Sequence, residues 1–100
     1  MIITKSIVEN IVRISLSGRL DTVTASKLSD ELGKIFEADF KSLVFDFSSL
    51  DYISSSGLRV LLTAQKKVNA TGAEMKITGA SDAVKEIFEF TGFASIMIIE

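Results

Sequence analysis

Apolar and polar residues alternate near the start of the chain in the way that half-buried strands require. Two β-prone runs, Ile2–Val8 and Ile11–Ser17, stand on either side of Glu9-Asn10. In the second run the apolar side carries Val12, Ile14 and Leu16. The pattern predicts a β-hairpin, although no Asn-Gly pair settles the type of its turn.

Three later segments repeat apolar residues every three or four positions, which is the period of an amphipathic helix. They run from Ala25 to about Phe36 or Ala38, from Ser55 to Ala70, and from Ser81 to Thr91-Gly92. Residues that favour the N-cap precede the first helix: Asp21, Thr22 and Thr24. The apolar side of the second helix carries Leu58, Leu61, Leu62, Gln65 and Val68, and Gly72 is expected to end it.

Short apolar runs between the helices predict the remaining strands, which are Ser42–Phe47, Glu74–Thr78 and Ser95–Ile99. The predicted order is β-β-α-β-α-β-α-β, and alternation of this kind is typical of an α/β sheet with mostly parallel pairing. The opening hairpin adds an antiparallel part. We therefore expect one α/β domain over residues 1–100, with a mixed five-stranded sheet covered by helices.

Composition excludes several classes of function. The chain has 100 residues, 47% of them hydrophobic, with no histidine and no cysteine. It therefore lacks Ser-His-Asp and Cys-His catalysis and any metal site held by histidine or cysteine. We expect a protein that is not an enzyme and has no cofactor. The net charge of −2 comes without a basic patch, so we expect no direct nucleic-acid binding.

The chain shows no sign of a membrane-spanning or exported segment. No apolar run approaches the roughly 20 residues that span a bilayer, and the first residues lack the pattern of a signal peptide. We therefore expect a cytoplasmic domain with no membrane contact.

The polar hinge before the second helix is the strongest candidate for chemistry. Ser54, Ser55, Ser56 and Gly57 stand where the free N–H groups and the dipole of the helix favour negative charge. A serine here can cap the helix, bind an anion or carry a phosphate, and the local pattern leaves all three open. Gly57 is expected to let the groups of a partner approach the backbone closely.

Two further sets of residues have a structural and a functional interpretation. The carboxylates of Asp21, Asp46 and Asp51 could form an oxygen-only Mg²⁺ site, although caps and turns use the same residues. On the second helix, a polar side is either simply solvated or half of a docking surface. It consists of Arg59, Thr63, Lys66 and Asn69.

The stretch from Asp46 to Leu61, DFSSLDYISSSGLRVL, resembles the signature of STAS domains of the anti-sigma factor antagonist group. Two other segments support the resemblance. Gly18-Arg19-Leu20-Asp21 is similar to the segment before the first helix of the family, and the region from Ala73 to Phe93 is similar to its C-terminal half. The chain differs from many members at Ser54, where aspartate is usual.

The resemblance implies partner switching. An unphosphorylated member binds an anti-sigma factor that is a serine kinase, and so frees a sigma factor. Phosphorylation of the serine before the glycine, here Ser56 and less favourably Ser55, releases the antagonist, and a phosphatase resets it. The residues expected to contact the partner are Asp21, Thr22, Thr24, Ser54, Ser55, Gly57 and Arg59.

Other STAS domains belong to stress-signalling scaffolds or to transport-associated complexes. A module that holds an anion or a nucleotide at the serines without covalent change is therefore the alternative hypothesis. Covalent phosphate distinguishes the two, because it survives denaturation.

Overall fold

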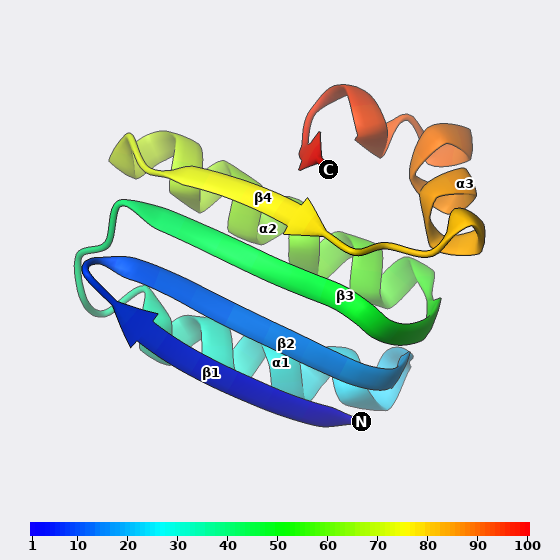
Figure 1. The fold of residues 1–100 in the computed structure, drawn as a ribbon, viewed down its shortest axis with the longest axis horizontal. Helices are drawn as coiled ribbons and strands as arrows, with labels where there is room; N and C mark the ends of the chain where they lie inside the picture. Colours follow the sequence, from blue (N-terminus) through cyan, green and yellow to red (C-terminus); the bar gives the residue numbers. More distant parts are fainter.

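The computed structural model describes residues 1–100 and contains one five-stranded sheet with three α-helices (Figure 1). The elements in chain order are β1 (Ile2–Val8), β2 (Ile11–Leu20), α1 (Thr22–Ile35), β3 (Ser42–Ile53), α2 (Ser55–Thr71), β4 (Glu74–Thr78), α3 (Asp82–Thr91), a 3₁₀-helix η1 (Phe93–Ser95) and β5 (Ile98–Ile99). The predicted α/β class and the mixed sheet are confirmed.

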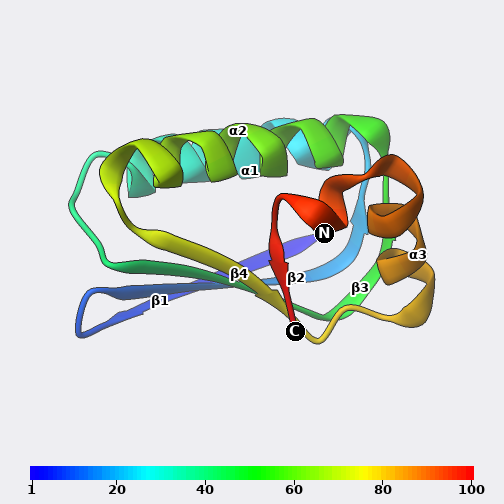
Figure 2. The same cartoon turned by 90° about the horizontal axis from the view of Figure 1, so that it is seen from above.

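The order of the strands in the sheet is the same as their order in the chain, β1-β2-β3-β4-β5. β1 is antiparallel to β2, and all later neighbours are parallel. Because parallel crossovers are right-handed, successive steps in one direction keep their helices on one side of the sheet. Figure 2 shows α1 and α2 lying side by side on that face, whereas α3 lies at the end of the sheet. The opposite face has no helix.

The first two strands form the predicted hairpin, with Val8 opposite Ile11. The two loop residues, Glu9 and Asn10, have φ of 51° and 67°. Positive φ at both positions is what a type I′ turn requires, and its twist matches that of the strands. The structure thus settles the turn type that the sequence left open.

The middle strands are longer than predicted. β2 continues past Ser17 to Leu20, and β3 continues past Phe47 to Ile53. The register between them shifts where Ser17 pairs with Ser49, so the apolar residues no longer alternate. Leu50 and Ile53 are nevertheless buried. Because of the bulge, the second half of β3 does not alternate between apolar and polar residues, and the sequence pattern did not predict it.

The core lies between the sheet and the paired helices. The predicted inner side of α2 is confirmed, since its leucines and Val68 are buried except for Leu62, which is half-buried. The largest fully buried side chains include those of three phenylalanines: Phe45, Phe47 and Phe88. Buried residues of the strands and of all three helices form one continuous core, which holds the helices against the sheet.

The predicted last strand, Ser95–Ile99, is mostly wrong. Gly92 ends α3 with φ of 83°, and the chain then turns through η1. The backbone N–H groups of Ile96 and Met97 both donate to the carbonyl of Phe93, each at 3.1 Å. Only Ile98–Ile99 pairs with β4. The apolar composition of the segment indicated a strand, but only Met97 is buried in the core.

Candidate functional site

The N-termini of α1 and α2 lie next to each other because β2 and β3, which lead into them, are neighbours in the sheet. The backbone N–H of Ser54 donates to the carbonyl of Leu20 at 2.8 Å. This bond joins the end of β3 to the end of β2. Asp21–Thr24 and Ser54–Gly57, far apart in sequence, therefore lie next to each other, and we call the two segments together the serine site.

The α1 side of the serine site is a complete capping box. The carboxylate of Asp21 accepts from the backbone N–H of Thr24 at 3.0 Å, and the backbone N–H of Asp21 donates to the hydroxyl of Thr24 at 2.8 Å. The bond from the Thr24 backbone, followed by one from the Thr24 hydroxyl to the same carboxylate at 3.0 Å, holds the pKa of Asp21 below its ordinary value. Asp21 and Thr24 thus have a structural role, and the hydroxyl of Thr22 takes no part in the capping box.

The α2 side assigns different roles to the three serines. Ser54 is the N-cap, and its hydroxyl accepts from the backbone N–H of Gly57 at 3.2 Å. Ser55 is exposed. Ser56 is half-buried, and its hydroxyl lies 3.5 Å from the hydroxyl of Thr22 on α1. The hydroxyl of Ser56 is therefore not needed by the cap and stands between the two helix N-termini.

The sequence suggested that Gly57 lets a partner approach the backbone, and the structure gives a different reason for glycine at this position. Gly57 is buried and faces the interior. A Cβ at this position would lie 2.7 Å from Cγ of Leu20 and 3.1 Å from Cγ1 of Ile53. The glycine thus lets α2 sit close on the ends of β2 and β3, and it does not open the backbone to a partner.

Arg59 lies one turn beyond Ser56, is exposed and forms no salt bridge with another residue. The sequence reasoning missed a second arginine nearby. Cζ of Arg19 lies 4.2 Å from the centroid of the Tyr52 ring, and the two residues are paired in register at the ends of β2 and β3. A prediction that Arg19 and Tyr52 lie beside the N-termini of α1 and α2 would have required the full length of β2 and β3.

The three carboxylates do not form a metal site. No group of three or more acidic, histidine or cysteine side chains in the chain is arranged to hold an ion. Asp46 instead accepts from the hydroxyl of Ser48 at 2.6 Å and from its backbone N–H at 3.0 Å. These two bonds, led by the one from the hydroxyl, lower the pKa of Asp46. Asp51 is exposed.

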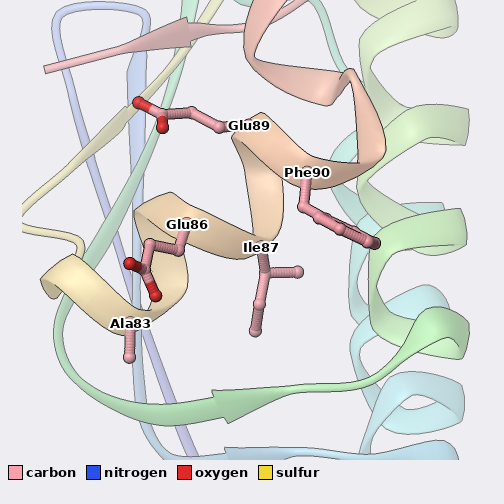
Figure 3. A pocket seen from close by; sticks show the side chains of 5 residues that line it. All are labelled: Ala83, Glu86, Ile87, Glu89 and Phe90. Atoms are coloured by element: carbon pink, nitrogen blue, oxygen red, sulfur yellow. The ribbon is translucent and has the colours of Figure 1, made fainter.

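The largest hollow, of about 690 Å³, lies away from these residues along α3. Figure 3 shows the residues that line it: Ala83, Glu86, Ile87, Glu89 and Phe90. All five come from one helix, so the hollow is a shallow surface feature, and Phe90 is 94% exposed on it. None of the predicted site residues lines it.

None of the helices has the length and apolar composition needed to cross a membrane.

The chain is similar in sequence to known regulators. The family model of the STAS domain matches residues 3–100. BtrV of Bordetella bronchiseptica, named as an anti-sigma factor antagonist, is 32% identical over 96% of this chain and 83% of its own length. The anti-sigma-B factor antagonist of Staphylococcus aureus strain NCTC 8325 is 26% identical over 84% of this chain and 78% of its own.

The fold is also similar to that of solved structures. The unphosphorylated form of the anti-sigma factor antagonist SpoIIAA superposes with a TM-score of 0.86 at 22% identity, covering 99% of this chain and 88% of that one. The phosphorylated form of SpoIIAA from Bacillus superposes with a TM-score of 0.78 at 20% identity, covering 99% of this chain and 91% of that one. The chain therefore belongs to the STAS domain family and, within it, to the anti-sigma factor antagonists.

Proposed function

We propose that the protein works by partner switching, with Ser56 as the switch. In its unphosphorylated form it binds an anti-sigma factor that is a serine kinase, and this binding frees a sigma factor in the cytoplasm. Transfer of a phosphate from ATP to the Ser56 hydroxyl releases the antagonist, and a phosphoserine phosphatase restores it by hydrolysis. The relatives named above, which are anti-sigma factor antagonists, support the choice of partner.

The observation that carries the proposal is that Ser54 and Ser56 have different hydrogen-bond partners. Ser54 caps α2, whereas the Ser56 hydroxyl has only a long contact of 3.5 Å, with Thr22. A modification of Ser56 therefore leaves the cap in place. The free N–H groups at the start of α2 and the helix dipole favour the added charge of about −1.5 to −2.

The cost of the phosphate falls on the complex and not on the fold. An unpaired charge left in an interface costs several kcal/mol, and each 1.4 kcal/mol changes affinity about tenfold. One phosphate at the centre of a dry contact is thus sufficient to release the partner.

The test is the intact mass of the protein after incubation with ATP and its purified anti-sigma factor. We expect the wild type and the Ser55→Ala variant to gain one phosphate that survives denaturation, and Ser56→Ala to gain none. Full phosphorylation of Ser56→Ala would assign the switch to another residue. A ligand that is lost on denaturation would instead support the noncovalent anion or nucleotide module.

A second measurement tests the consequence of the charge. We expect Ser56→Asp to weaken binding to the anti-sigma factor in calorimetric titration while its melting temperature stays close to that of the wild type. Equal affinity of Ser56→Asp and the wild type would show that the partner does not cover this serine.

A further inference from the structure

A groove of about 220 Å³ is lined by residues of both α1 and α2, which lie side by side (Figure 2). We call it the α1–α2 groove. Its walls include Ser29 and Gly33 from α1, Phe36 at the C-cap of α1, and Arg59, Thr63 and Lys67 from α2. The contact between Thr22 and Ser56 lies at the N-terminal ends of the same two helices. The groove therefore lies further along the same two helices, and begins at Arg59 on α2, about one turn after Ser56, and at Ser29 on α1, about two turns after Thr22.

The charge of the groove has one sign. Arg59 and Lys67 line it, no acidic residue does, and neither cation forms a salt bridge with another residue of the chain. Nζ of Lys67 lies 5.4 Å from the centroid of the Phe36 ring, which places its charge over an aromatic wall. An occupant that complements the groove carries carboxylates beside an apolar side chain.

Gly33 is an independent observation. It lies inside α1 and is exposed, its φ is not positive, and no atom lies within 4 Å of the place where a Cβ would be. Packing therefore does not require glycine here, although glycine costs a helix about 1 kcal/mol relative to alanine. What its missing side chain does provide is space in the wall of the groove.

We propose that the α1–α2 groove binds an acidic segment of the anti-sigma factor, with an apolar side chain of that segment seated at Gly33. The inference rests on the proposed function for the identity of the partner. The volume favours a protein segment over a small ligand, because ligand pockets usually measure about 300–1,000 Å³. Arg59 can hold a carboxylate of the segment with two parallel hydrogen bonds.

The groove also explains how a phosphate on Ser56 is sensed. Ser56 and Arg59 are three positions apart on α2, where side chains are neighbours at about 5–6 Å between Cβ atoms. Long side chains on a helix lean toward its N-terminus, which brings the guanidinium of Arg59 toward Ser56. In the complex Arg59 is engaged by a carboxylate of the segment, so a phosphate on Ser56 is left unpaired there and repels the segment. In the free protein the phosphate pairs with Arg59.

The test uses the full ¹⁵N-labelled chain and a designed helical peptide with leucines on one side and glutamates next to them. A second peptide, with glutamine in place of every glutamate, is the control. We expect the acidic peptide to shift the amide resonances of Gly33, Thr63 and Lys67, and to bind about tenfold or more tightly than the glutamine peptide. Comparable affinity of both peptides would overturn the electrostatic part of the proposal.

Variants of the chain locate the contact. We expect Lys67→Glu and Gly33→Leu to abolish binding of the acidic peptide, because one reverses a charge and the other fills the groove. Lys66→Glu is the matched control: it makes the same charge change at the adjacent exposed residue, which does not line the groove. A loss in Lys66→Glu as large as in Lys67→Glu, or undiminished binding by Gly33→Leu, would refute the proposal.

Two further arms separate this inference from the proposed function and from simple anion binding. The Ser56→Asp variant should bind the acidic peptide more weakly than the wild type does, and this difference in affinity should become smaller at high salt. The peptide titration needs no kinase, so failed phosphorylation and failed groove binding are separate results. Inorganic phosphate that shifts the same amides as strongly as the peptide at equal concentration would replace the peptide site with a small-anion site.

Discussion

Ser54 and Ser56 are two positions apart, and the structure gives their hydroxyls different partners. Ser54 accepts from the backbone of its own helix, whereas Ser56 faces Thr22 on the neighbouring helix. This explains how the chain can carry serine where many related proteins have aspartate. Serine and aspartate are both effective N-cap residues, so the exchange keeps the cap and changes only the charge.

The different roles of the two serines predict different effects on stability. We expect Ser54→Ala to lower the free energy of unfolding by about 1 kcal/mol, because a cap is lost. Ser56→Ala should change it by only a few tenths of a kcal/mol, since its single contact is long and exposed. Urea denaturation of both variants measures this. A larger loss for Ser56→Ala would mean that the cap is assigned to the wrong serine.

Asp46 predicts how stability depends on pH. Its pKa is lowered in the folded state by the two bonds from Ser48, so folding favours the ionised carboxylate. This contribution is present above the unfolded pKa of about 3.9 and is lost as the pH falls through the lower folded pKa. The melting temperature of Asp46→Asn should therefore fall less steeply than that of the wild type between about pH 5 and pH 3. Parallel slopes would show that the Ser48 bonds do not favour the ionised form.

At the scale of the elements, the fit of α2 against the sheet depends on one buried glycine. Gly57 brings the first turn of α2 onto the ends of β2 and β3, and this contact sets where Ser56 stands relative to α1. Gly33 on α1 has no such neighbour. The two helical glycines therefore serve opposite purposes, one close packing and the other open space.

Alanine at these two positions should have effects of opposite sign. Gly57→Ala puts a methyl group 2.7 Å from Leu20, and overpacking of this kind typically costs about 1–3 kcal/mol. Gly33→Ala should instead stabilise the protein by up to about 1 kcal/mol, because alanine is the better helix former. Thermal denaturation of both variants measures the difference. Stabilisation by Gly57→Ala would mean that α2 can move away from the sheet without loss.

At the scale of the whole molecule, β1 is an exposed edge of the sheet. Three of its apolar side chains are more than half exposed: Ile2, Ile7 and Val8. Lys5 pairs with Ile14 in register, so it points to the helix side, where it lies 3.7 Å from Glu31 on α1. An inward-pointing lysine in an edge strand is a known means of preventing strands of separate molecules from pairing.

Lys5 is therefore predicted to limit self-association. We expect Lys5→Val to sediment as larger species than the wild type as concentration increases, because the helix side of β1, which carries Ile3 and Ile7, becomes continuously apolar and the strand loses its only charge. Lys34→Val is the control, since Lys34 also pairs with Glu31, at 3.5 Å, but lies on α1. Sedimentation velocity measures both. If the two variants associate to the same extent, the loss of a positive charge next to Glu31, and not the change in the edge strand, causes the self-association.

Much of this molecule could be predicted from local patterns. The order of the elements, the buried side of α2, and the places where the helices start and end follow from periodicity and capping chemistry, which act over a few residues. The motif around Ser56 likewise identified the family, which the comparisons confirm. The contact residues and the phosphorylation of Ser56 remain proposals.

The tertiary structure decided what depends on contacts between distant segments. Pairing between β2 and β3 continues past the bulge to Leu20 and Ile53, and the turn after Gly92 leaves only a short last strand. The burial of Gly57 against Leu20, the approach of Ser56 to Thr22 and the groove at Gly33 all join residues far apart in the chain. Local propensity carries no information about such pairs. The role of each residue depends on a neighbour from a distant segment, and that neighbour comes into contact only when the sheet brings α1 and α2 together.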